Sequence, residues 1–293
     1  TISLSDSYFS YDIDMTPDPN LNPQIVGGNP DKNWFLFRIP VRKPNASVGN
    51  PSFSNIQYVR LRFKGGVAKV IIAEWRLVGS NWQRVNDFQN IPKDDSVLSV
   101  SFVNLWENAK APDFYEMPPG VTQPRVLNNP DPYNEIKMNE QSLSLTVQNL
   151  NFGESRMATR IFHSLDIFYY KTLKFFIHGD ATMPAQIWGK SIPKAYAFIR
   201  FGIDSLNYYE YRKPLLRGWQ DIVIDLNEIT SIKQTRDTSR LYNIQTFPAK
   251  NDSLATFVIR GNPILTRVQF FGFGIENPPE QFPNQLTTTM WVN

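Results

Sequence analysis

Short stretches in which apolar and polar residues alternate recur along the chain. In residues 56–63, one face of this alternation consists of Gln57, Val59, Leu61 and Phe63. Successive side chains of a strand point to opposite sides, so a period of two predicts a β-strand. Gly65 and Gly66 then permit a turn, after which residues 67–75 return as a second strand. The pattern predicts a β-hairpin over this segment.

Similar patterns predict further strands, whereas few segments suit a helix. The other predicted strands are residues 34–41, 96–102, 142–150, 172–177, 195–203, 221–226, 255–260 and 267–275. Two short helices are expected, at residues 157–166 and 226–233. The 22 prolines argue against longer helices, because each proline removes a backbone donor and fixes φ. The chain is therefore expected to be mainly β.

A proline-rich segment at residues 111–135 divides the chain. Its prolines are Pro112, Pro118, Pro119, Pro124, Pro130 and Pro132. No regular element runs through prolines at this spacing, so the segment is interpreted as a connector. We expect one β-sandwich module at residues 1–110 and another at residues 136–293, both of the jelly-roll, galactose-binding-like type. It stays open whether the first module is complete at its N-terminus, because little strand sequence precedes its first aromatic cluster.

The charge and composition narrow the classes of partner. The net charge is only +3 and the basic residues are dispersed, so an extended nucleic-acid surface is not expected. The chain has no cysteine, which excludes disulfides and thiolate metal sites. No apolar stretch has the length of a membrane helix. Residues 67–78 are long enough for a barrel strand, but Lys69, Glu74 and Arg76 fall on both faces, so this segment is not expected to span a membrane.

Residues suited to catalysis are few. The two histidines, His163 and His178, do not have the spacing of a zinc-binding pair. The acids considered for glycoside hydrolysis are Asp204, Glu210, Asp221 and Asp225. The last two lie on one face of one short strand, where isolated acids are ordinary. A protein without catalytic residues, cofactor or metal is favoured, a glycoside-active enzyme is an alternative, and calcium binding is left open.

One aromatic cluster is a candidate surface for a ligand or a partner. It consists of Tyr208, Tyr209, Tyr211 and Trp219. Such rings can stack on sugars, so a secreted carbohydrate-binding β-sandwich module is one hypothesis. The strand pattern favours the other interpretation, in which alternate rings pack the core and the rest pair across strands.

Several sequence blocks follow the connector in a characteristic order. They are residues 138–150 with 153–156, 165–178, 198–202 with 207–211 and 214–215, 261–263, 274–278 and 291–293. Within them, Leu165-Asp-Ile-Phe-Tyr-Tyr-Lys-Thr-Leu-Lys-Phe-Phe-Ile-His178 is similar to a family pattern in which a leucine–aspartate strand runs into YK-LK-F-H. In these blocks the chain resembles the SprA/Sov family of gliding-motility and secretion proteins.

The resemblance implies a role in protein export. Members of this family look like giant outer-membrane barrels that form the translocon of the type 9 secretion system, with further domains inserted around the barrel. The chain is then expected to be a non-catalytic accessory domain that acts as a scaffold, a cap or a docking surface. The implied partners are other segments of the parent barrel, secretion-system subunits and exported cargo.

The resemblance also implies a location at the outer membrane, on its cell-surface or its periplasmic side. The sequence begins without a methionine and ends directly after a strand pattern. We therefore expect it to be a piece of a longer polypeptide.

Overall fold

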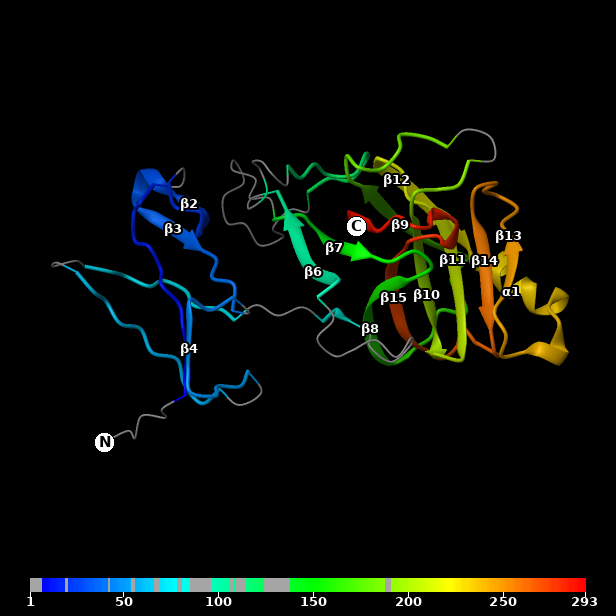
Figure 1. Cartoon of the computed structure of the whole chain (residues 1–293), viewed down its shortest axis with the longest axis horizontal. Coiled ribbons are helices and arrows are strands. Elements are labelled where there is room, and N and C mark those ends of the chain that lie inside the picture. The colour runs from blue at the N-terminus through cyan, green and yellow to red at the C-terminus, as the bar shows by residue number, and fades with distance from the viewer. Residues whose placement is uncertain are drawn as a thin grey trace. The chain divides into compact units, whose positions relative to one another are not determined.

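Two compact units make up the chain in the computed structural model (Figure 1). The structure describes residues 7–18, 21–41, 43–53, 56–65, 69–77, 81–84, 96–105, 108, 114–123, 138–187 and 191–293. The first unit comprises residues 1–78 and 106–108, and the second comprises residues 79–105 and 109–293.

The second unit consists of two antiparallel sheets. The larger sheet has the strand order β13 (Gln245–Pro248), β14 (Thr256–Arg260), β11 (Asn207–Pro214), β10 (Tyr196–Asp204), β15 (Val268–Glu276), β8 (Ser155–Leu165) and β5 (Gln83–Arg84). The smaller sheet has the order β12 (Gly218–Asp225), β9 (Thr172–Gly179), β16 (Leu286–Val292), β7 (Gln141–Leu150) and β6 (Leu98–Asn104). Many neighbouring strands are far apart in sequence, which is typical of β-sandwiches.

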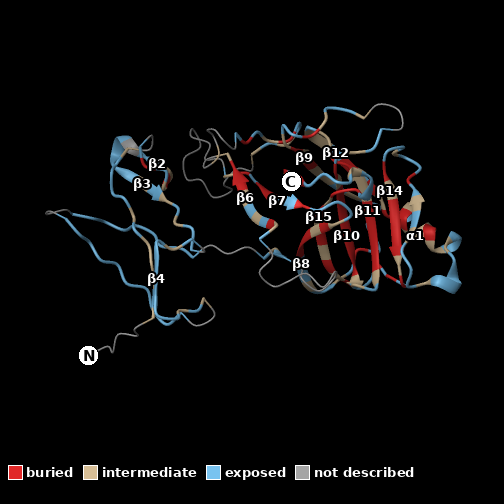
Figure 2. Cartoon of the chain, viewed as in Figure 1, coloured by how far each residue is buried: buried red, intermediate tan, exposed pale blue. Residues whose placement is uncertain are grey.

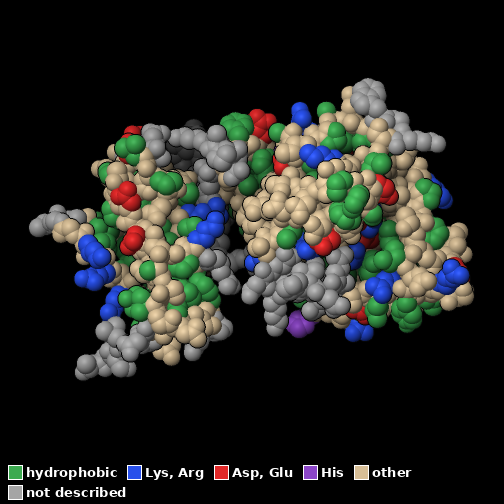
Figure 3. All heavy atoms as spheres, in the orientation of Figure 1, with side chains coloured by type: hydrophobic (Ala, Val, Ile, Leu, Met, Phe, Trp, Pro, Cys, Tyr) green, Lys and Arg blue, Asp and Glu red, His purple; other side chains and the backbone are tan. Residues whose placement is uncertain are grey.

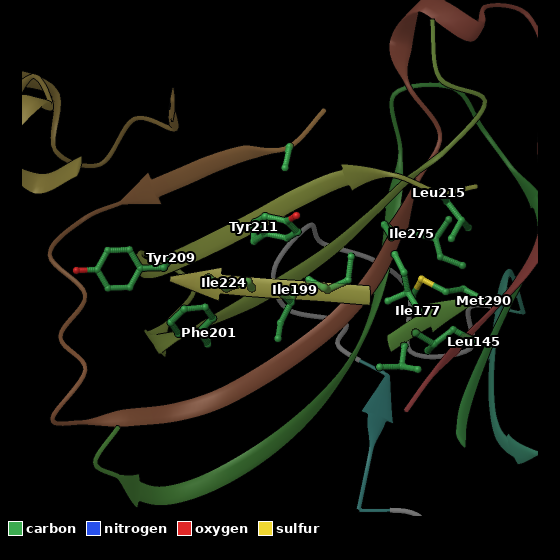
Figure 4. Close-up of a cluster of buried hydrophobic side chains, with 14 of the residues drawn as sticks. Leu145, Ile177, Ile199, Phe201, Tyr209, Tyr211, Leu215, Ile224, Ile275 and Met290 are labelled. Carbon is green, nitrogen blue, oxygen red and sulfur yellow. The ribbon is translucent and has the colours of Figure 1, made fainter. Parts of the chain in front are cut away.

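A hydrophobic core lies between these two sheets. Because side chains alternate along a strand, Ile199 and Phe201 of β10 point inward, where they join one buried cluster with Met290 of β16 (Figure 4). The rings of Phe175 and Phe273, one from each sheet, lie 5.2 Å apart. Burying an apolar side chain of this size stabilises the fold by about 1.5–3 kcal/mol. The second unit is therefore a β-sandwich with its own core.

One α-helix, α1 (Leu226–Thr235), covers the edge of this core. The Asp225 carboxylate caps it by accepting hydrogen bonds from the backbone N–H groups of Asn227 and Glu228. The buried side chains of α1 are Leu226, Ile229 and Ile232. A 3₁₀ helix at Thr238–Arg240 and another at Pro279–Gln281 complete the unit's described helices. Within the described ranges, no helix is long and apolar enough to cross a membrane.

The mainly β prediction is confirmed, as is the helix at residues 226–233. All eight further predicted strands overlap an observed strand, from β3 (Trp34–Phe37) to β15. The predicted helix at residues 157–166 is wrong, because this segment lies in β8. It pairs with β15 from Ser155 to Leu165, and this long-range ladder satisfies the backbone groups that a helix would have satisfied locally.

The first unit contains two small sheets. Strand β1 (Tyr8–Ser10) pairs with β4 (Ala46–Val48), and β2 (Ile25–Asn29) pairs with β3, with a 3₁₀ helix at Pro30–Lys32 between β2 and β3. Among the described residues of this unit, Ile25 is the one buried apolar side chain, and most of the unit is exposed (Figure 2). Hydrogen bonds from buried Asn22 to the carbonyls of Asp14 and Thr16 help to hold it together.

The predicted hairpin at residues 56–63 and 67–75 is not formed as strands. Residues 56–65 and 69–77 are described and lie in no strand, while residues 66–68 are outside the described residues. Among the backbone hydrogen bonds of turns and loops between described residues, none involves either stretch. The apolar alternation is present in the sequence, but the paired neighbour that a strand requires is not found in the described part.

The unit boundary differs from the predicted module boundary at residue 110. Strand β6 pairs with β7 over its full length, from Leu98 to Asn104, and β5 pairs with β8. Residues 79–105 therefore belong to the second unit. Of the predicted connector at residues 111–135, the described residues 114–123 also belong to this unit, and the rest lies outside the described residues.

Candidate functional site

The three candidate tyrosines lie on β11, inside the larger sheet. Tyr208, Tyr209 and Tyr211 are 2%, 1% and 4% exposed, so no ring offers a surface to a ligand. Tyr209 and Tyr211 point into the core between the sheets (Figure 4), whereas Tyr208 points to the opposite face and packs with Val258 and Phe270. Burial raises the pKa of all three phenols. As a docking platform these three residues are a wrong prediction, because both faces of β11 are buried.

An ion-pair network occupies the outward face of the same sheet. Fully buried Glu210 accepts hydrogen bonds from Arg200 at 2.6 Å through Oε2 and from Arg212 at 2.8 Å through Oε1. Arg212 also donates to Glu276 at 3.0 Å. The Arg200 guanidinium lies 4.3 Å from the centre of the Tyr208 ring, a cation–π contact. Both carboxylate oxygens of Glu210 are thus engaged, and the network joins β10, β11 and β15.

The other candidate acids have local structural partners or lie apart. The Asp204 carboxylate accepts hydrogen bonds in the turn before β11, from the backbone N–H of Leu206 and from Asn207 Nδ2. Asp225 caps α1, and Asp221 is exposed on β12. Four residues of strand separate Asp221 from Asp225, about 13 Å at 3.3 Å per residue. Paired glycosidase carboxylates lie about 5–9.5 Å apart, so this pair does not match that chemistry.

Trp219 belongs to a different cluster, on the outward face of the smaller sheet. The strand register places Trp219 of β12 and Trp291 of β16 on either side of His178 on β9, in one row across the sheet. The His178 ring stacks on Trp291 with centroids 4.4 Å apart and lies 5.0 Å from Trp219. We call these three residues the aromatic row. All three are partly exposed.

A short segment around Tyr115 covers part of the aromatic row. The buried Tyr115 ring makes edge contacts with Trp291 at 5.4 Å and Trp219 at 6.3 Å, and Trp219 Nε1 donates to the Glu116 carbonyl at 3.0 Å. The Tyr115 hydroxyl donates to Glu140 Oε2 at 2.6 Å. Burial and the adjacent Glu140 raise the pKa of Tyr115. The row is therefore a covered aromatic layer, not an open platform.

Trp219 and His178 are candidates from the sequence alone, whereas Tyr115 and Trp291 are not predicted as site residues. Trp291 faces His178 only because β16 lies beside β9, a neighbour that local patterns do not reveal. Tyr115 falls in the predicted connector, where no contact was expected. In the sequence, only the aromatic character of Tyr115 and Trp291 points to such a cluster.

The described residues offer little for a bound cofactor or metal. Among them, no group of three or more His, Asp or Glu side chains is placed to hold a metal ion. A gap between the sheets, lined by Phe175, Ile199, Tyr211 and Met290 among others, has a volume of about 10 Å³. That is room for one water molecule at most.

The largest exposed apolar stretch that we find lies in the first unit. All described residues of 56–65 and 69–77 are exposed, and the first unit is mostly pale blue in Figure 2. The large apolar side chains exposed there are Ile56, Tyr58, Val59, Leu61, Phe63, Val70, Ile71, Ile72, Trp75 and Leu77. We call residues 56–65 and 69–77 the exposed arm. Apolar exposure of this extent is uncommon on a protein surface and requires an explanation.

Comparison with known proteins adds a family and a distant structural likeness. The family SprA_N, described as motility related/secretion protein, matches residues 1–218, including the part before residue 138 that the sequence blocks did not cover. Among curated proteins, none matches the chain. The solved structure of an exo-β-agarase aligns with 75% of this chain and 23% of its own chain, at 10% identity and a TM-score of 0.37. A likeness at that level shows neither a common fold nor a common activity.

We expect a large loss of stability when the shared carboxylate of the Glu210 network is removed. Glu210→Gln leaves two arginines without their shared buried carboxylate, which should lower the free energy of unfolding by about 3–5 kcal/mol. Urea-induced unfolding measures this change. The control is Glu74→Gln, since Glu74 pairs with Arg76 while both side chains are more than half exposed, so the change should alter stability by less than about 1 kcal/mol. Equal effects of the two variants would contradict the structural role of the network.

The burial of His178 leads us to expect that the stability of the chain depends on pH. Burial lowers the pKa of His178 from its ordinary value of 6.5, and Asp180 partly opposes this shift. The unfolded chain then binds more protons than the folded chain below about pH 6.5, so stability should decrease as the pH falls toward about 5. Partial exposure keeps the slope below the limit of about 1.4 kcal/mol per pH unit for one group.

Unfolding curves at several pH values test this assignment. His178→Gln should lose that part of the pH dependence, whereas His163→Gln should retain it, because His163 is exposed on β8. The same pH dependence in wild type and in His178→Gln would rule out His178 as its source.

Proposed function

Because the chain belongs to the SprA_N family of motility-related and secretion proteins, we propose that it is a non-catalytic accessory domain of an outer-membrane type 9 secretion translocon. In this proposal it supports protein export and gliding motility by docking other polypeptides of the secretion apparatus. The second unit is the rigid scaffold and the exposed arm of the first unit is the docking element.

The exposed arm is the observation that supports docking. A sheet or strand that is apolar on one face requires a second layer to bury that face. In the first unit the described residues bury one apolar side chain, Ile25, while the arm exposes ten large ones. A core of one apolar residue contributes little to stability, so the first unit gains most from a partner that covers the arm.

The sequence of the arm indicates how a partner binds. Val59, Leu61 and Phe63 share one parity of an extended segment, and Arg60 and Arg62 share the other. An added strand would pair with the backbone of this segment and cover the apolar parity. The basic parity favours a partner surface that carries acidic side chains. Other segments of the parent barrel and secretion-system subunits are the partners we propose.

The carbohydrate-binding alternative loses most of its support. Three of its four residues, Tyr208, Tyr209 and Tyr211, are buried, and Trp219 is partly covered by Tyr115. Stacking on a sugar requires an open ring face. Docking of a polypeptide at the exposed arm is therefore the function that we favour.

Charged substitutions in the arm should abolish docking. The double variant Leu61→Asp/Phe63→Asp places two charges where the partner would bury apolar side chains, so affinity should fall about tenfold or more. The measurement is recovery of secretion-system subunits from detergent-solubilised outer membranes by the tagged chain.

The matched control is Ile161→Asp, which charges a position that is 70% exposed on β8 of the other unit. This control should recover the same subunits as wild type. Undiminished recovery by the double variant, or no recovery by the wild-type chain, would overturn the proposal.

A further inference from the structure

Four loops gather at one end of the second unit. They are residues 166–171, 204–207, 240–243 and 261–267. The hydrogen bonds that join them are Ile167 N–H to the Leu265 carbonyl (2.9 Å), Gly261 N–H to the Leu241 carbonyl (2.7 Å) and Asn262 N–H to Asn207 Oδ1 (2.9 Å). Figure 1 shows β14 running to the lower edge of this unit, where the turn between β10 and β11 also lies. We call this set of loops the loop end.

The loop end exposes large apolar and aromatic side chains. Phe168, Tyr169 and Tyr170 follow one another in the loop between β8 and β9 and are 59%, 87% and 66% exposed. Tyr242 and Leu206, in two of the neighbouring loops, are also exposed. Hydrophobic side chains (green) lie along the same lower edge in Figure 3. Three consecutive exposed rings are not explained by the packing of the sandwich.

The aromatic loop is held in place by its own hydrogen bonds. Asp166 Oδ1 accepts from the backbone N–H of Phe168 at 2.9 Å, and Tyr170 N–H donates to the Ile167 carbonyl at 3.2 Å. The side chain of Ile167 is buried in the core and anchors the loop to it. The rings of Phe168 and Tyr169 contact each other edge to face at 5.3 Å. A loop fixed in this way presents its rings without an ordering step on binding.

Basic side chains lie in the same set of loops as these rings. Lys171 follows Tyr170 directly, and Arg267 and Arg240 lie in or beside the neighbouring loops; all three are exposed. The acids in or beside these loops are Asp166, Asp204 and Asp237, and Asp237 pairs with Arg240. Arg236 and Arg260 add positive charge, because they donate hydrogen bonds to the Gly261 and Tyr242 carbonyls of the same loops. Basic side chains therefore outnumber acidic ones at the loop end.

We propose that the loop end is a membrane-contact site, at which Phe168, Tyr169 and Tyr170 enter the headgroup region of a bilayer that contains anionic lipid. Aromatic rings are favourable there, because their apolar bodies reach the acyl chains, while the hydroxyls of the two tyrosines stay hydrated. Lys171 and its basic neighbours lie where they can meet lipid phosphates. A bilayer accepts a projecting ring without a preformed pocket, whereas a protein partner must supply a pocket shaped for each ring.

Vesicle flotation with the whole chain tests the proposal. Wild type should bind vesicles of phosphatidylethanolamine and phosphatidylglycerol more strongly than vesicles of phosphatidylcholine alone. The triple variant Phe168→Ser/Tyr169→Ser/Tyr170→Ser should reduce the partition coefficient about tenfold or more, because three rings no longer enter the interface. Lys171→Glu should weaken binding to the anionic vesicles only.

The matched control is Phe282→Ser. Phe282 is 68% exposed and contacts Phe152 in the turn between β7 and β8, at the opposite end of the sandwich, so its replacement should leave binding unchanged. Circular dichroism verifies that each variant remains folded. Equal binding by wild type and the triple variant would overturn the proposal.

A different partner class gives a different result. A photo-crosslinking group at position 169 that joins the chain to an envelope protein, with no binding of wild type to either vesicle, would make the loop end a protein-docking surface and the bilayer proposal wrong.

Discussion

Burial of apolar side chains between two sheets is the constraint on which the second unit depends. Both sheets alternate apolar and polar residues, and the apolar faces meet in one cluster that includes Phe201 and Met290. This packing also determines the environment of β11, which has a neighbouring strand on each side, so Tyr209 and Tyr211 are core residues. The same position buries Glu210 on the other face, where two arginines neutralise it. The side chains of this unit that can contact a partner therefore lie at its ends and on its outer surface.

The first unit lacks that constraint among its described residues. Its two small sheets bury Ile25, while the exposed arm carries a strand-like sequence without strand pairing. An apolar strand pattern without a covering layer is unfavourable in water, which is the physical basis of our proposal that a partner supplies the layer. In that proposal the second unit is the folded scaffold, and the first unit is completed by binding.

Local patterns predicted half of the strands in the described residues, eight of sixteen, and the helix at residues 226–233, because these patterns act over a few residues. They failed where distant segments decide the structure. Residues 157–165 form a strand because they pair with β15. Residues 98–104 belong to the second unit because they pair with β7. The aromatic row also requires the order of β12, β9 and β16. For Tyr208 to Tyr211, parity assigned the faces, but only the fold shows that both faces are buried.

Hydrogen exchange of the chain on its own tests the division of roles most directly. The account predicts slow exchange of amides in β10, β11 and β15, whose ladders lie inside a buried sheet, and exchange near the unstructured rate across residues 56–65 and 69–77. Addition of the solubilised secretion complex should then slow exchange in the arm and leave the sandwich unchanged. Strong protection of the arm in the chain alone would contradict the account, because the arm would already be paired.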